Sequence, residues 1–253
     1  MSCLLFKHTF ILHILLAGGG MGWLACGRSG GRSIQDYYFP VEALKAGRVY
    51  EYTSRGNGDD AVSEYWYYKG FQRDSGWFLS ATFYDQNFQI GQIMREKMEK
   101  SGATAREFFL YEPDTITQQQ APVPVFIDSP HIFPFQVRDS SGALFQLSYH
   151  PIWEPDATVT LVRRRRFLGD APAFKFRGQS YPAIRFDVRE TIGNDRSDGE
   201  TVEGVGEEWY AKGIGLVYVR KTYGAGELTI ENRLNDIFMM TELERRAKEV
   251  YEK

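Results

Sequence analysis

The arginine run Arg163–Arg166 is the most concentrated charge in the sequence. If this segment is a strand, its side chains alternate between two faces, so Arg163 and Arg165 point the same way. At the mouth of a cavity, these two side chains could hold an anionic headgroup through charge-assisted hydrogen bonds. The alternative is that the arginines pair across the sheet with carboxylates such as Glu190 or Asp187.

The sequence contains no recognisable catalytic or metal-binding pattern. Glu207 and Glu208 could serve acid–base chemistry, but neighbours on a strand point to opposite faces and do not converge on one bond. His131 and His150 belong to no His-Glu-x-x-His motif, and no Cys-x-x-Cys motif is present. We therefore expect a protein that is not an enzyme and that has neither a metal site nor a cofactor.

Residues 1–25 are typical of an export signal. Lys7 is the only charged residue before Arg28, and an apolar segment that ends in small residues lies between them. A retained transmembrane helix is the alternative, but the segment is short, glycine-rich and not followed by a basic stop-transfer cluster.

Leu24–Gly27 resembles the lipobox of bacterial lipoproteins, in which the cysteine, here Cys26, is acylated and becomes the new N-terminus. That resemblance implies anchoring to a membrane through N-terminal acyl chains. The resemblance also implies a location in the cell envelope, at the outer membrane and facing the periplasm, because the residue after the cysteine, Gly27, is not aspartate. The alternative is a plain signal-peptidase cut after Ala25. Residues 26–35 are polar and glycine-rich, which predicts a flexible tether after the lipidated cysteine.

Residues 36–253 are predicted to form a single, mainly all-β domain. Aromatic residues make up 15% of the chain, which favours strands, and period-two patterns separated by turn residues recur throughout. No helical crossover pattern intervenes, so we expect an antiparallel curved sheet or an incomplete β-barrel. The predicted strands are residues 48–53, 63–71, 77–85, 90–100, 143–149, 158–168, 181–191, 207–210, 216–223 and 227–234. For residues 90–100 a helix is the alternative, because their apolar side chains also fit one helical face.

Two segments depart from this strand pattern. Residues 113–134 contain five prolines, which predicts a long excursion and not a central strand. Residues 236–252 carry apolar side chains at spacings of three and four, which predicts a C-terminal amphipathic helix packed on the sheet. Asn235 or Asp236 is expected to cap the start of that helix.

Several of the predicted strands are apolar on both faces, as in residues 77–79 and in the segment that contains Trp66 and Tyr68. A sheet with one solvated face would have a polar residue at every second position, so both faces must be covered. One covered face could line an apolar ligand cavity, in which we place Trp66, Tyr68, Arg163 and Arg165 as candidate ligand-binding residues. The alternative is plain core packing on both faces.

The closing part of the chain resembles bacterial periplasmic proteins of the LolA-like lipoprotein-carrier type. The resemblance lies in residues 176–186, in residues 207–217 and in the strand that ends at Leu234. Asp36–Pro40 followed by Gly47–Tyr52 is also similar to the opening of small envelope lipoproteins. The resemblance implies a half-barrel whose concave side holds acyl chains, without catalysis.

These observations predict a membrane-tethered envelope lipoprotein that binds a lipid or another apolar ligand in a concave β-sheet. The alternative is an accessory module that docks onto an envelope protein partner through a sheet edge or through the Pro113–Pro134 segment. A nucleic-acid partner is not expected, because the net charge is -3 and the sequence pI is near 5.9.

Overall fold

The computed structural model describes residues 31–252, except residues 58–60, 139–140, 197–200 and 225. The predicted signal peptide (residues 1–25), Cys26 and residues 27–30 lie outside the described residues. The described part of the chain contains no helix with the length and apolar character needed to span a bilayer.

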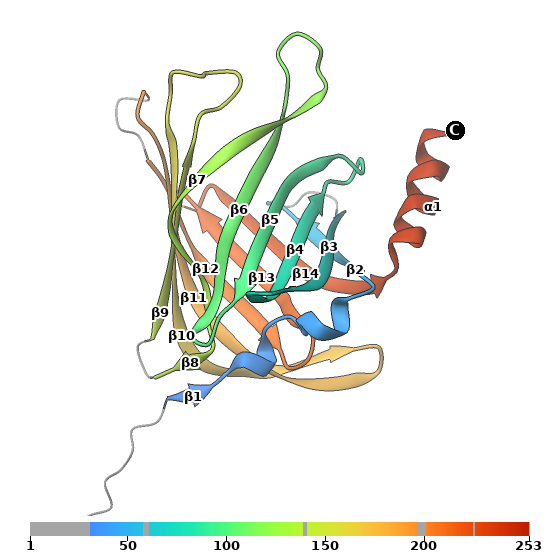
Figure 1. Cartoon of the computed structure of the whole chain (residues 1–253), viewed down its shortest axis with the longest axis vertical. Coiled ribbons are helices and arrows are strands. Elements are labelled where there is room, and N and C mark those ends of the chain that lie inside the picture. The colour runs from blue at the N-terminus through green and yellow to red at the C-terminus, as the bar shows by residue number, and fades with distance from the viewer. Residues whose placement is uncertain (1–30, 58–60, 139–140, 197–200, 225, 253) are drawn as a thin grey trace, which may run out of the picture. The chain divides into compact units, whose positions relative to one another are not determined.

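A closed barrel of twelve antiparallel strands forms the domain (Figure 1). Each strand pairs with the next along the chain, and the last strand pairs with the first, with Leu234 opposite Tyr52. The barrel strands are β2 (Arg48–Arg55), β3 (Val62–Arg73), β4 (Gly76–Tyr84), β5 (Ile90–Met98), β6 (Gly102–Pro113), β7 (Gln120–Pro134), β9 (Gly142–Tyr149), β10 (Val159–Phe176), β11 (Gln179–Asn194), β12 (Thr201–Ala211), β13 (Gly215–Tyr223) and β14 (Leu228–Phe238).

The expectation of a mainly β, antiparallel fold is confirmed, but the expectation of an incomplete barrel is wrong. Closure depends on the β14–β2 pairing, which joins residues from the two ends of the domain. Period-two patterning identifies strands but does not say whether the first and last of them meet.

The proline-containing segment 113–134 is also not an excursion, because most of it is β7. Pro122 and Pro124 lie in the part of β7 that pairs with β6 alone, since pairing with β9 begins at Val125. The β6–β7 hairpin projects beyond the neighbouring strands there (Figure 1). A strand with one unpaired side tolerates proline, which lacks the amide donor of a ladder hydrogen bond. Pro130 lies next to a register shift between Ile127 and Ser129, where the ladder is already irregular.

An N-terminal plug, which we define as residues 34–47, closes one end of the barrel (Figure 1). It contains the short 3-10 helices η1 (Gln35–Tyr37) and η2 (Val41–Leu44) and is anchored through the Ile34 amide, which donates to the Phe135 carbonyl at 3.0 Å. Just before the plug, β1 (Arg32–Ser33) pairs with β8 (Gln136–Val137). Residues 32–35, which were predicted to lie in the tether, therefore belong to the folded domain.

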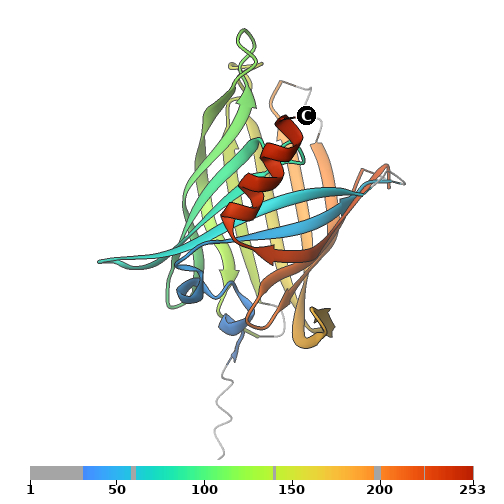
Figure 2. The same cartoon turned by 90° about the vertical axis from the view of Figure 1, so that its right-hand side faces the viewer.

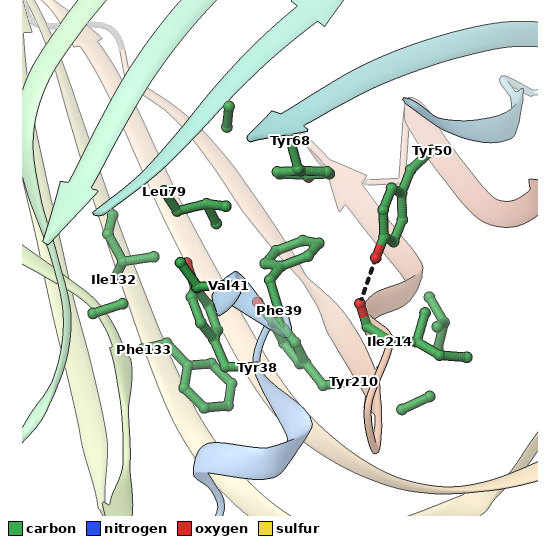
Figure 3. Packing of buried hydrophobic residues seen from close by; sticks show 14 of the residues in the cluster. Tyr38, Phe39, Val41, Tyr50, Tyr68, Leu79, Ile132, Phe133, Tyr210 and Ile214 are labelled. Carbon is green, nitrogen blue, oxygen red and sulfur yellow. Dashed lines mark hydrogen bonds between the residues drawn. The ribbon is translucent and has the colours of Figure 1, made fainter. Parts of the chain in front are cut away.

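The plug inserts aromatic side chains into the barrel (Figure 3). The Tyr38 ring lies 4.9 Å from the Phe133 ring, and the Phe39 ring lies 4.1 Å from the Tyr68 ring, measured between centroids. Gly70 makes close approach of the plug possible, since a Cβ there would lie 1.9 Å from the carbonyl oxygen of Val41. Buried aromatic pairs of this kind contribute about 0.5–1.5 kcal/mol each beyond their area.

The C-terminal helix α1 (Met240–Tyr251) lies on the outside of the barrel across β2 and β3 (Figure 2). Leu243 packs there against Val49 and Tyr65, so the expected packing of this helix on its own sheet is confirmed. The helix is shorter than predicted because residues 236–238 continue β14 and pair with β2. Its N-cap residue is Met239 with no side-chain cap, so the predicted capping by Asn235 or Asp236 is wrong. Asp236 instead accepts a hydrogen bond from Arg177 at 2.5 Å.

Candidate functional site

The barrel encloses a partly open cavity of about 390 Å³. Inward-facing side chains of the strands line it, and Tyr38 and Phe39 of the plug form its floor. The volume falls within the range of about 300–1,000 Å³ that is typical of small-molecule sites. A side-chain lining in alternate positions of each strand is what barrel geometry requires.

All four predicted ligand-binding residues line this cavity. Trp66 and Tyr68 occupy successive inward positions of β3, and Arg163 and Arg165 occupy successive inward positions of β10. Residues that are far apart in the sequence are thus brought into one chamber. Arg164 is exposed, as strand alternation requires.

Arg165 of β10 is buried inside the barrel and forms an ion pair with Glu208 of β12. Its Nε donates to Glu208 Oε2 at 2.7 Å, and its Nη1 donates to the Ile132 carbonyl at 3.2 Å. Tyr210 also donates to Glu208, at 2.9 Å. Burial alone would raise the pKa of Glu208, but the positive charges of Arg165, Lys221 and Arg163 outweigh that effect and lower the pKa to about 2.

Arg163 and Lys221 share a second buried carboxylate, Glu190. Arg163 Nε donates to Glu190, Lys221 Nζ lies 2.8 Å from Glu190 Oε1, and Tyr223 donates to Oε2 at 2.6 Å. Lys221 also lies 3.8 Å from Glu208, so the two ion pairs form one network. Burial opposes ionisation of Glu190, but Arg163 and Lys221 hold its pKa well below the usual range.

The predicted alternative of cross-strand pairing therefore holds for Arg163, which pairs with Glu190, and for Arg166, which lies 3.4 Å from Asp187 on the outer face. Pairing and cavity lining are not exclusive, because Arg163 does both.

Two glycines in β12 make the second ion pair possible. Gly204 and Gly206 stand between β11, which carries Glu190, and β13, which carries Lys221 and Tyr223. A Cβ at Gly204 would lie 2.5 Å from the Tyr223 ring, and a Cβ at Gly206 would lie 1.9 Å from the Arg220 carbonyl oxygen. Without side chains at these positions, Lys221 and Tyr223 reach across β12 to Glu190.

Glu96 of β5 is a buried carboxyl that has no cation within hydrogen-bonding distance among the described residues. It is 2% exposed and accepts a hydrogen bond from Tyr38 of the plug. Burial raises the pKa of Glu96 from its usual 4.5 to about 7, and the Tyr38 hydrogen bond and the charge of Arg165 oppose this only in part. Glu96 is therefore largely protonated below neutral pH.

A further hollow of about 450 Å³ lies outside the barrel interior, around the plug. Its charged residues Asp36, Glu42 and Lys212 are exposed to solvent. Exposed charges of this kind bind weakly, since water screens them. We therefore take the barrel cavity as the candidate site, although its volume is the smaller of the two. Within the described residues, no group of three or more His, Cys, Asp or Glu side chains is placed to hold a metal ion.

Sequence reasoning missed Glu96, Glu208 and Lys221 as members of the site, and it named Glu190 only as a partner of the arginines. Each is a charged residue in the inward phase of a strand that also has apolar inward residues, such as Val219 before Lys221 and Met94 before Glu96. That pattern was a usable signal. What it did not reveal was that four strands bring these charges together.

No protein-family model and no curated protein sequence matches this chain. Two solved structures share its fold at low sequence identity. A protein classed as a lipoprotein from Parabacteroides distasonis has a TM-score of 0.52 and 13% identity, over 79% of this chain and 97% of its own. A protein from Bacteroides fragilis, classed as exported and as having a YmcC-like fold, has a TM-score of 0.51 and 16% identity, over 79% of this chain and 98% of its own. At these identities the likeness establishes the barrel fold alone.

We predict that Arg165→Met destabilises the protein by about 3–5 kcal/mol, because it leaves Glu208 buried without its main charge partner. The double variant Arg165→Met/Glu208→Met should recover most of that loss, as a buried ion pair is often replaceable by apolar side chains. Urea denaturation at pH 7 measures both values. A double variant no more stable than Arg165→Met would contradict this account of the pair.

We predict that Glu96→Gln changes how stability depends on pH. Between pH 4.5 and 7 the folded protein retains a proton on Glu96 that the unfolded chain has released, so its free energy of unfolding falls as pH rises. Glutamine does not titrate, and it can still accept the Tyr38 hydrogen bond. From pH 4.5 to 7.5 the variant should gain about 3 kcal/mol relative to the unaltered protein.

Urea denaturation at four pH values across this range measures the difference. Glu107→Gln, on the outer face of β6, is the control for loss of a carboxyl elsewhere in the barrel. Parallel pH profiles for Glu96→Gln and the unaltered protein would rule out the buried titration.

Proposed function

We propose that this chain is a non-catalytic, membrane-tethered lipoprotein of the bacterial cell envelope that binds one lipid or other apolar ligand inside its barrel. The observation that carries the proposal is the 390 Å³ cavity between the plug and the far end of the barrel. Apolar side chains such as Leu147, Leu161 and Val219 face into it, whereas charged side chains such as Arg164 and Arg185 are on the outer face. An apolar ligand would therefore leave water by entering the barrel.

The proposed location rests on the sequence of residues 1–35 and on the two solved structures with the same fold. The sequence predicts an export signal followed by acylation at Cys26. One of the two structures is classed as a lipoprotein and the other as an exported protein. We place the tethered domain at the outer membrane, facing the periplasm, because Gly27 is not aspartate.

The resemblance to LolA-like carriers supports this proposal through their function, the binding of acyl chains. It does not extend to their half-barrel architecture, because this barrel is closed. Such carriers imply a concave sheet that holds acyl chains, and the apolar side chains that line part of the closed barrel offer a comparable surface. Docking of an envelope protein is the second candidate function. Exposed apolar side chains on and beside β7, namely Phe126 at 60% and Ile116 at 89% exposure, favour it.

We expect mass spectrometry of the protein purified from its native membrane to find a chain that begins at an acylated Cys26. Under non-denaturing conditions, the same preparation should also carry one small apolar molecule per chain. An intact Met1 or an unmodified Cys26 would reject the lipoprotein assignment. Recovery of a stoichiometric protein without any small ligand would favour the second candidate function.

We also expect that filling the cavity abolishes ligand binding. Leu161→Trp adds bulk to an inward position of β10, whereas Val162→Trp adds the same group to the next, outward position. The uncharged fluorophore N-phenyl-1-naphthylamine should bind the unaltered protein and Val162→Trp with equal affinity. Leu161→Trp should bind it at least about tenfold more weakly, because a group of indole size takes up space that the probe needs. Equal binding by all three proteins would place the probe outside the barrel.

A further inference from the structure

The barrel cavity has one charged wall and one apolar wall. The buried ion network lies on the adjacent strands β10 to β13. The lining from β3, β5, β6 and β9 is mainly apolar and includes Trp66, Met94, Leu110 and Leu147. A ligand that fits both walls must be amphiphilic.

The charges of the network do not balance. Arg163, Arg165 and Lys221 supply three cationic groups, and Glu190 and Glu208 supply two carboxylates whose pKa values are lowered by these cations against the effect of burial. Burial and the charge of Arg163 lower the pKa of Lys221, and the contacts of Lys221 with Glu208 and Glu190 oppose that shift and favour its charged form. Glu96, whose pKa is raised by burial to about 7, adds no full charge in mildly acidic solution. One positive charge is therefore in excess on this wall of the partly open cavity, where it favours an anionic group.

Arg163 is the cation with donors to spare. Its side chain is 26% exposed and lines the cavity, and within the described residues its guanidinium donates only through Nε, to Glu190. Arg165, by contrast, is 6% exposed and uses Nε, Nη1 and Nη2 on Glu208 and the Ile132 carbonyl. The two terminal nitrogens of Arg163 form a fork suited to the two oxygens of a carboxylate or phosphate group.

We infer that the ligand is an amphiphile with a single oxyanion, a carboxylate or a phosphate ester, which is held by Arg163 while its apolar chain lies against Trp66, Met94 and Leu110. This inference rests on the proposed binding function and specifies its ligand class. The oxyanion neutralises the excess positive charge of the network, and the chain covers the apolar wall. An anion without a chain leaves the apolar wall uncovered, and an uncharged lipid leaves the excess positive charge unpaired. Both should therefore bind more weakly than the amphiphilic anion.

Displacement of N-phenyl-1-naphthylamine from the full purified chain at pH 6 tests the inference. The competitors are dodecanoate, dodecan-1-ol and the dodecyltrimethylammonium cation, all below their aggregation concentrations, with acetate and inorganic phosphate as anions without a chain. Dodecanoate should displace the probe at a concentration about tenfold or more below that of dodecan-1-ol, the effect of one charge-assisted hydrogen-bonded pair. The cation, acetate and phosphate should be weaker still.

Arg163→Gln should lower the ratio of dodecan-1-ol to dodecanoate displacement concentrations from about tenfold or more to about one. Both competitors are measured on the same variant, so a general change in the cavity cancels from this ratio. The matched control is Arg164→Gln, which removes the neighbouring exposed charge and should keep the full preference.

The outcomes separate this inference from the proposed function. Equal displacement by dodecanoate and dodecan-1-ol in the unaltered protein would overturn the oxyanion assignment and leave apolar binding intact. A preference that survives Arg163→Gln would overturn the role of Arg163. Failure of the probe and of every chain-bearing competitor to bind would reject the binding function itself.

Discussion

Closure of the sheet is the constraint on which the other features of this domain depend. Once β14 pairs with β2, every strand of the barrel has a neighbouring strand on both sides over at least part of its length. The inward side chains then face one enclosed space. Twelve strands enclose more volume than these side chains fill. The plug occupies one end of that space with Tyr38 and Phe39, and the remainder is the cavity. The plug and the cavity thus share the space that the closed barrel encloses.

The enclosed space has an unusual content for a core, because it holds charged groups beside aromatic ones. Buried ion pairs are poor stabilisers compared with apolar packing of the same size, since both partners lose their hydration. The network of Arg165, Glu208, Lys221 and Glu190 is therefore better understood through what it makes possible than through its contribution to stability. It places polar donors at a fixed depth inside an otherwise apolar chamber, which is the composition of a selective binding site.

The sequence predicted strands well and their closure poorly. Alternation in segments such as residues 181–191 was sufficient, because the inward residues there are mainly apolar and the outward residues are mainly charged. The prolines of residues 113–134 led to the wrong prediction of an excursion. A strand accommodates Pro122 and Pro124 because β7 extends past β9 at these positions, which the sequence does not reveal. In the site, Trp66, Tyr68, Arg163 and Arg165 were identifiable as inward pairs. Glu96 was not, because its role depends on Tyr38 of the plug, a contact between distant parts of the chain.

The projecting part of the β6–β7 hairpin presents a strand with one side unpaired, which in general invites another chain to add a strand to it. Pro122 and Pro124 fall within this stretch, where β7 pairs with β6 alone. Each proline removes a main-chain donor that an added strand would use and fixes a backbone angle. These two residues therefore work against sheet-to-sheet association of neighbouring copies, a hazard for any protein that has an exposed strand edge.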